Sequence, residues 1–344
     1  MKKYLITSYI LTFMVFFFPW LAAGSGSSAA DSPPETAELS QPVEDSSAET
    51  PPAAVVPAGP LDSQRIIRVL VGGEVREMDM GTYLVGVVRA EMPAVFEIEA
   101  LKAQAVAART YTIYKMDNGG SVNHPEADAC DDINCCKAYM DTAAAAASWG
   151  ENASAYEERI QTAVRDTDGQ CVLYEGEPVL AVFHSSSAGA TMDAASVWSA
   201  AVPYLVSVPS PESGETVPNY YTSATFTISA LKSLLLAALP EADLSASPTD
   251  WFTNIRQTPG GAVTALDVGG TEVSGNRLRT ILGLRSPAFT FSFSGDSVTF
   301  TVTGYGHGVG MSQYGANILA ADGMDYREIL SRYYTGTTVA VYSL

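Results

Sequence analysis

The order of apolar and polar positions predicts a chain of mixed helices and strands. Residues 66–71 and 75–78 predict a pair of short strands joined by a glycine turn. Residues 98–116 predict a long helix, because they are rich in Ala, Leu, Lys and Gln, which favour helices. Residues 83–89, just before it, predict a shorter helix or buried segment. The first half of the folded chain therefore alternates both kinds of element.

The second half continues the mixture. Alternating apolar positions predict strands at 170–174, 179–183, 289–293 and 297–302, and 3.6-residue periodicity predicts a helix at 228–239 capped by Ser229. Shorter helices are expected at 274–285, from Ser312 and after Asp325, where Glu328 completes a capping box. We predict an α+β fold of helices and antiparallel strands, with two lobes around a central cleft and the second lobe at about 206–284.

Residues 1–23 predict a membrane-targeting segment. Two lysines are followed by an apolar run that is long for a signal peptide, which has a stretch of roughly 7–15 residues, and near the roughly 20 of a bilayer span. The lysines favour an uncleaved, single-pass anchor with a cytoplasmic N-terminus, so the remainder is expected on the extracytoplasmic side of the cell membrane. Cleavage after Ala23 remains the alternative.

Composition changes after this segment. Residues 24–62 hold seven acids and no Lys, Arg or aromatic residue, which predicts a disordered acidic linker rich in Pro, Ser and Ala. Residues 63–344 are then predicted to form the folded domain. The formal charge of the whole chain is -19, which argues against nucleic acid as a general partner.

Two cations stand out on the long predicted helix. Lys102 and Arg109 share a face with Val106 and Ile113, at spacings of four, seven and eleven residues. They form either one wall of a binding site or the charged ends of side chains that reach out of a packed helix to solvent.

Three blocks of sequence resemble the stage II sporulation protein D family. The first combines GVVRAEMP at 86–93 with EALKAQAVAARTY at 99–111. The second is FHSSSAG at 183–189, followed by Val197-Trp198 and by PYL at 203–205. The third is GYGHGVGMSQYGA at 304–316. The resemblance extends over roughly 66–344.

The resemblance implies a peptidoglycan lytic transglycosylase. Such an enzyme cuts between N-acetylmuramic acid and N-acetylglucosamine in strands stripped of stem peptides and leaves 1,6-anhydro ends. The glutamate of the EMP motif, Glu91, would be the single catalytic acid and base. Its expected setting is cell-wall remodelling in sporulation and engulfment, with a peptidoglycan amidase and a membrane protein as partners.

The family blocks also suggest residues that contact the glycan. We expect Arg109, and less directly Lys102, to read the free lactyl carboxylate of a stripped strand, because Arg binds carboxylates in a bidentate manner. Cations lower the pKa of a nearby acid, so they should face the substrate and not Glu91. The predicted substrate-binding residues are Lys102, Arg109, His184, Ser185, Tyr204, Tyr305, His307, Gln313 and Tyr314.

A cysteine-containing loop follows the long helix. His124, Cys130 and Cys136 match the positions that bind zinc in some family members, and imidazole and thiolates suit tetrahedral zinc. Cys135 is either a further zinc ligand, a disulfide partner or a free thiol with neither role. A Cys130–Cys136 disulfide is the competing interpretation, because export favours oxidation.

Other functions compete with this prediction. Some relatives are described as amidase enhancers, so the alternative is a non-catalytic wall-binding protein that stimulates a partner amidase. A pure binder would have no need of Glu91. A zinc hydrolase lacks support because the chain has no HExxH motif, and a serine hydrolase lacks support because no Gly-x-Ser-x-Gly elbow surrounds Ser185.

Overall fold

The computed structural model describes residues 59–121, 123–132, 135–198 and 200–342. The predicted anchor at 1–23 and most of the predicted linker lie outside the described residues. Within these described ranges, no helix is long and apolar enough to cross a membrane.

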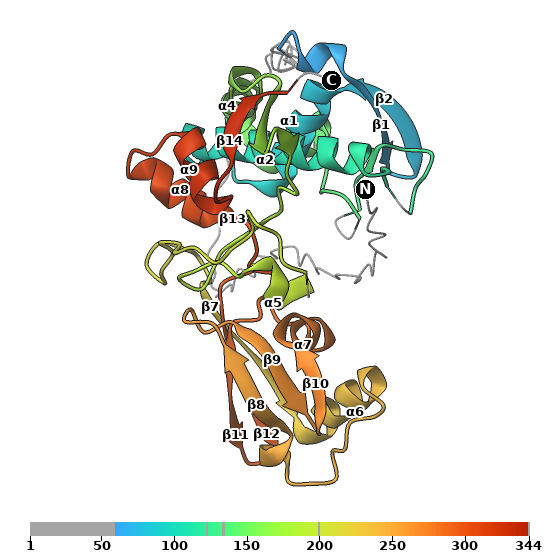
Figure 1. Ribbon diagram of the computed structural model, residues 1–344, viewed down its shortest axis with the longest axis vertical. Helices are drawn as coiled ribbons and strands as arrows, with labels where there is room; N and C mark the ends of the chain where they lie inside the picture. The colour runs from blue at the N-terminus through green and yellow to red at the C-terminus, as the bar shows by residue number, and fades with distance from the viewer. Residues whose placement is uncertain (1–58, 122, 133–134, 199, 343–344) are drawn as a thin grey trace, which may run out of the picture.

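Helices and mainly antiparallel strands confirm the α+β class, and buried apolar residues form two separate cores. The first core is drawn from both ends of the described chain, at the top of Figure 1. Its elements are η1 (Asp62–Gln64), β1 (Ile66–Val71), β2 (Glu74–Asp79), α1 (Met80–Glu91), α2 (Ile98–Asp117), β3 (Ala129–Cys130), α3 (Thr142–Trp149), η2 (Gly150–Asn152), α4 (Ala153–Asp166), β4 (Gln170–Tyr174), β5 (Glu177–Pro178), β6 (Phe183–His184), α5 (Ala194–Trp198), β13 (Met311–Ser312), α8 (Gln313–Ala321), α9 (Tyr326–Tyr333) and β14 (Thr338–Val341).

The second core is made from one continuous stretch of chain, at the bottom of Figure 1. Two three-stranded antiparallel sheets, β11-β12-β7 and β10-β9-β8, build it together with two helices. Its ends adjoin, because the amide of Gly304 donates to the carbonyl of Tyr220 at 2.8 Å. Its elements are β7 (Tyr221–Thr227), α6 (Ile228–Ala238), η3 (Pro248–Asp250), β8 (Phe252–Gln257), β9 (Val263–Val268), β10 (Thr271–Ser274), α7 (Gly275–Leu282), β11 (Phe289–Ser294) and β12 (Ser297–Thr303).

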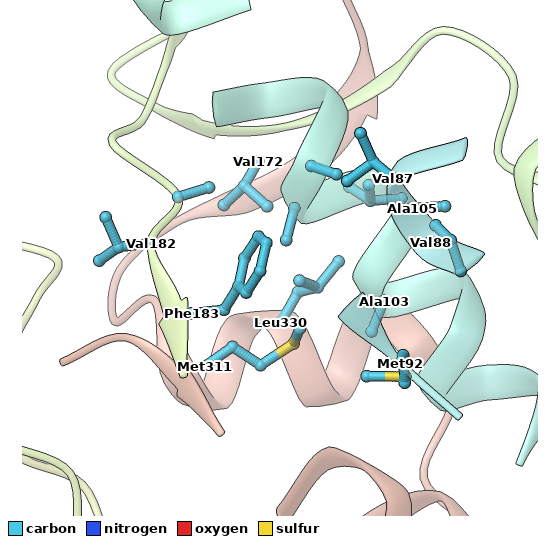
Figure 2. Packing of buried hydrophobic residues seen from close by; sticks show 14 of the residues in the cluster. Val87, Val88, Met92, Ala103, Ala105, Val172, Val182, Phe183, Met311 and Leu330 are labelled. Carbon is cyan, nitrogen blue, oxygen red and sulfur yellow. The ribbon is translucent and has the colours of Figure 1, made fainter. Parts of the chain in front are cut away.

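The first core joins segments that are far apart in sequence. Figure 2 shows Val87 of α1 and Ala105 of α2 near Phe183 and, from the C-terminal part, Met311 and Leu330. A short parallel pairing of β6 with β13, Phe183 to Met311, connects the middle of the chain to its last quarter. This pairing brings the second and third family blocks side by side.

Helix α2 is fixed to the start of the described chain by a buried ion pair. The Arg109 guanidinium donates to both carboxylate oxygens of Asp62, at 2.9 Å from Nε to Oδ1 and 2.6 Å from Nη2 to Oδ2. It also donates to the carbonyls of Gln170 and Val164. Asp62 is 3% exposed, so the structure places this residue in the folded part and not in the linker to which its composition assigns it.

Local capping follows the predictions in one helix and departs from them in another. Asp325 and Glu328 form the predicted capping box of α9, which confirms that start. Helix α6 is capped by Thr227, whose side chain accepts from the amide of Ala230, so the prediction of Ser229 as the cap is wrong. Thr227 is the last residue of β7, where the extended backbone places the hydroxyl over the helix start.

Candidate functional site

Glu91 is the last residue of α1, and its position follows from how that helix ends. Met92 has an extended backbone because Pro93 disfavours the helical conformation before it. The Glu91 carboxylate accepts from the backbone amide of Ala138 at 3.3 Å and from Nε2 of Gln313 at 3.4 Å. Three segments from different parts of the chain therefore meet at this carboxyl group.

The carboxyl group of Glu91 is shielded from solvent and lies near the ammonium of Lys137. Burial raises the pKa of Glu91 above its ordinary value, and the ammonium of Lys137 is the main opposing influence. Lys137 Nζ lies 3.8 Å from the ring centre of Phe183 and 4.1 Å from that of Tyr111. Burial lowers the pKa of Lys137 to about 8. A raised pKa keeps a larger fraction of the carboxyl group protonated, which suits Glu91 to donate a proton.

Two cavities of similar size meet at Glu91. The larger, of about 310 Å³, is lined by residues that include Lys137 and His307 and, from helix α7, Arg279. The smaller, of about 300 Å³, is lined by residues that include Phe96, Trp149 and Tyr314. The two cavities share Ala90, Glu91, Ser185 and Gln313. Among the described residues that line them, Glu91 is the one carboxylate.

Gln313 orients one oxygen of Glu91. It is buried at the start of α8, and its Nε2 lies 3.4 Å from both Glu91 Oε2 and Gln104 Oε1. Two acceptors on the same nitrogen fix which way the amide points. The next residue, Tyr314, packs edge to face on Phe96 with ring centres 5.0 Å apart and presents an aromatic wall to the smaller cavity.

The two histidines of the larger cavity are held as neutral groups. His307 Nδ1 accepts from the amide of Val309, so its proton is on Nε2, which donates to the carbonyl of Phe183. His184 Nδ1 lies 3.1 Å from the carbonyl of Val309 and therefore carries the proton there. Burial lowers the pKa of His184 to about 4 and also lowers that of His307. Both rings therefore line the cavity as neutral hydrogen-bonding groups and not as charged acids at neutral pH.

Six of the predicted substrate-binding residues line the cavities and three do not. Arg109 is fully buried in its ion pair with Asp62, so it has no exposed atom for a glycan. Lys102 pairs with Glu99 at 2.9 Å and with Asp166 at 3.7 Å, away from both cavities. The Tyr204 hydroxyl accepts from the amide of Leu180 and also lies apart from them. Arg109 is therefore unavailable to a glycan in this structure, whereas Lys102 and Tyr204 line neither cavity and their contact with substrate stays a prediction.

The cysteine loop offers a three-thiol group. The sulfur atoms of Cys130, Cys135 and Cys136 all lie within 4.8 Å of one another, with 3.8 Å between the last two. A hydrogen bond with Cys130 is the main influence that lowers the pKa of Cys136, to about 5, and Lys115 adds to it. Close thiols with one poised as a thiolate fit a zinc ion. Cys136 also lines the larger cavity.

His124 is not a member of this group. Its Nδ1 lies 3.7 Å from a carboxylate oxygen of Glu126, and its side chain is 29% exposed. The structure thus replaces the predicted His124 by Cys135 among the residues that would hold zinc. All four cysteines are in the thiol form in this structure, and a Cys130–Cys136 disulfide stays the alternative prediction.

Several residues of the site were not predicted from sequence. Lys137 follows the adjacent pair Cys135 and Cys136, which indicates metal binding and not a contact with Glu91. Arg279 lies in α7 of the second core, where the family resemblance is weak. A cluster of arginines at 277, 279 and 285 in an acidic chain was the available signal for the latter; Lys137 had none.

Known proteins resemble this chain over most of its length. A family model described as stage II sporulation protein matches residues 72–174. Stage II sporulation protein D of Bacillus subtilis (strain 168) is 36% identical over 266 residues, which cover 77% of this chain and 76% of that protein. The counterpart in Bacillus amyloliquefaciens is 35% identical, with 77% and 75% covered. An amidase enhancer of Bacillus subtilis (strain 168) is 31% identical over 308 residues, 75% of this chain and 40% of that protein.

Proposed function

This chain belongs to the stage II sporulation protein D family, and from that premise we propose that it is a lytic transglycosylase of peptidoglycan. The substrate would be a strand stripped of stem peptides, cut between N-acetylmuramic acid and N-acetylglucosamine. The setting would be wall remodelling in sporulation, outside the cell membrane, with residues 1–23 as the anchor.

The observation that carries this proposal is the single carboxylate at the junction of two cavities. We propose that the cavities form one cleft between the two cores, so that a glycan across it would have sugars on either side of Glu91. Hydrolysis of a glycosidic bond ordinarily needs two carboxylates, one as acid and one as nucleophile or base. A site lined by Glu91 alone favours chemistry in which the sugar supplies its own nucleophile.

The steps balance with one carboxyl group. Protonated Glu91 donates its proton to the glycosidic oxygen as the bond from that oxygen to C1 of N-acetylmuramic acid breaks. The C6 hydroxyl of the same sugar forms a new bond to C1, and the Glu91 carboxylate takes the hydroxyl proton. The products are a 1,6-anhydro end and a new hydroxyl on N-acetylglucosamine, and no water is consumed.

The chain's own residues would support both steps. Burial would favour the protonated acid before cleavage, and Lys137 would stabilise the carboxylate after it. The Ala138 amide and Gln313 would hold the two oxygens in place. Zinc held by Cys130, Cys135 and Cys136 would cross-link the loop that carries Lys137 and Ala138, and no proton transfer requires it.

Digestion of stripped strands by wild type and by Glu91→Gln tests the proposal. Wild type should yield fragments one water lighter than hydrolysis products, and the variant should yield none. Fragments with ordinary reducing ends would contradict the transglycosylase assignment.

The similarity to an amidase enhancer supports a second candidate, a non-catalytic protein that stimulates a partner amidase. This candidate would be favoured if wild type and Glu91→Gln both left strands intact but accelerated a partner amidase equally.

A further inference from the structure

A second buried carboxyl group lies behind the walls of the two cavities. Glu212 belongs to the segment that leads into β7, is 6% exposed and lines neither cavity. Among the described residues, no Lys, Arg or His forms an ion pair with it. Its Oε2 is buried and has no hydrogen-bond partner in the same part of the chain. Such a group costs folding free energy, and departures of this kind are typical of functional sites.

The other oxygen of this carboxyl group connects the second and third family blocks. Glu212 Oε1 accepts from the backbone amide of Ser187, in the second block, at 2.7 Å. It also accepts from the hydroxyl of Ser312, in the third block. The carbonyl of Ser185, at 3.4 Å, is a more distant acceptor for the same hydroxyl. One carboxylate oxygen therefore holds a residue from each block.

Ser312 connects Glu212 to the proposed acid. Its hydroxyl oxygen caps α8 by accepting from the amide of Gly315 at 3.2 Å, while its proton is directed to Glu212. The next residue, Gln313, places Nε2 3.4 Å from Glu91 Oε2. Because a cap fixes the first turn of a helix, the Glu212 carboxyl group determines where the Gln313 amide lies.

Ser187 makes a second connection, to the larger cavity. Its hydroxyl donates to Nε2 of His184 at 2.7 Å, since the other ring nitrogen carries the proton. His184 lines the larger cavity, and Gln313 lines both cavities. Glu212 thus supports two residues of the site and contacts neither of them itself.

The start of α8 packs closely on the segment that carries Glu212. A Cβ on Gly315 would lie 3.2 Å from Cδ of Glu212, so a glycine is needed there for the close approach. The segment is fixed by a 2.6 Å hydrogen bond between the hydroxyls of Ser210 and Tyr333. The hydroxyl of Tyr220 also donates to the Glu212 carbonyl at 3.3 Å. The carboxyl group is therefore a rigid support for the helix start.

We propose that Glu212 is a positioning residue: it holds Ser312, and through it the Gln313 amide, against the Glu91 carboxyl group. This rests on the proposed function, which supplies the reaction. Loss of Glu212 should slow the chemical step more than it weakens binding, because the residues that line the cavities remain while the acid loses its alignment.

Kinetics of the full chain on stripped strands test this, with circular dichroism to show that each variant is folded. Glu212→Leu removes the acceptor and should lower kcat about tenfold or more, with KM changed about threefold or less. Glu212→Gln keeps an oxygen that accepts from Ser187 and Ser312, so it should retain kcat within about threefold. If Glu212→Leu does not fold, Glu212→Asp should show the loss instead, because it withdraws the oxygens by one methylene.

A double variant and a control separate positioning from a general loss of stability. Gln313→Met should itself lower kcat, and adding Glu212→Leu should lower it by no more than about twofold further, because both changes disrupt the same contact with Glu91. Asp325→Ala is the matched control. It removes the cap of α9 in the same core, and Asp325 lines neither cavity, so kcat should persist while stability falls.

Four results would overturn the inference. They are a wild-type kcat in folded Glu212→Leu, an equal loss in Glu212→Gln, losses in the double variant that multiply fully, and an equal loss in Asp325→Ala. If wild type forms anhydro ends and one of these results is found, only the inference is overturned. If wild type forms no anhydro ends, the proposed function is overturned with it.

Discussion

Glu91 and Lys137 are the pair of opposite charges that sets the acidity of the proposed site. Burial raises the pKa of Glu91 and lowers that of Lys137, and each charge favours the charged form of the other. The sequence places Glu91 from the family motif, but it does not place Lys137, which is 46 positions away and reaches the acid only through the fold of the cysteine loop.

The pH dependence of cleavage should report the state of Glu91. A general acid works when protonated, so kcat/KM should fall as pH rises through the pKa of Glu91. Because that pKa is raised, the fall should occur above the range of an ordinary Glu, about 4.3. Rates on stripped strands across pH measure this. A profile that falls at or below the ordinary value would contradict the assignment of Glu91 as a buried acid.

Removing the neighbouring cation should shift this profile. Lys137→Met takes away the main influence that lowers the pKa of Glu91, so the fall in kcat/KM should move to higher pH. Lys232→Met is the control, because Lys232 lies 5.9 Å from the Trp251 ring centre in the second core, apart from both cavities. An unchanged pH profile in Lys137→Met would mean that the ammonium does not act on Glu91.

Helix α2 shows what periodicity can and cannot establish. The predicted helix at 98–116 is confirmed as Ile98–Asp117. Its shared face of Lys102, Val106 and Arg109 is real, but the partner of Arg109 is Asp62, 47 residues away and outside the predicted domain. Spacing within a helix contains no information on such a partner. The predicted strand at 179–183 is wrong for a similar reason. Of these residues only Phe183 forms strand pairing, and its partner, Met311, is far away in the sequence.

The Arg109 pair should stabilise the fold far more than the Lys102 pair. Arg109→Leu leaves the buried Asp62 carboxylate without its partner, which should cost about 3–5 kcal/mol of unfolding free energy. Lys102→Met breaks partly exposed pairs and should cost about 1 kcal/mol or less. Chemical denaturation of both variants measures the difference. Equal losses would contradict the structural role assigned to Arg109.

The cysteine loop should bind one zinc ion per chain through its three thiols. Cobalt substitution should give thiolate charge-transfer absorption that Cys135→Ser weakens and His124→Ala leaves intact, because His124 lies outside the three-thiol group. The measurement is metal content together with the absorption spectrum. A Cys130–Cys136 disulfide in the exported protein, detected by mass after alkylation, would support the competing interpretation.

At the scale of the whole molecule, the second core is an insertion into the first. The predicted lobe at about 206–284 overlaps it, while the core itself gathers residues from Leu231 to Val302. It extends beyond 284 because β12 pairs with both β11 and β7 and closes the unit. The strands at 289–293 and 297–302 are predicted from alternation, but the pairing of β12 with β7 joins residues far apart in the sequence.

Excision of this insertion should leave a folded first core. Joining Tyr220 to Gly304 in place of residues 221–303 should retain cooperative unfolding, because the two backbone ends already share a hydrogen bond. Glycan binding should drop, because Arg279, which lines the larger cavity, leaves with the insertion. Circular dichroism and binding to stripped strands measure the two outcomes. An unfolded product would mean that the first core depends on contacts such as those of buried Ala262 and Ala288.

The ion pair between Asp62 and Arg109 also ties the start of the described chain to helix α2. Tension along the chain that precedes Asp62 would reach α2 through the three charged hydrogen bonds between Asp62 and Arg109. Helix α2 packs on α1, which ends at Glu91. We therefore expect a pull on the preceding chain to act on the two packed helices that also position Glu91.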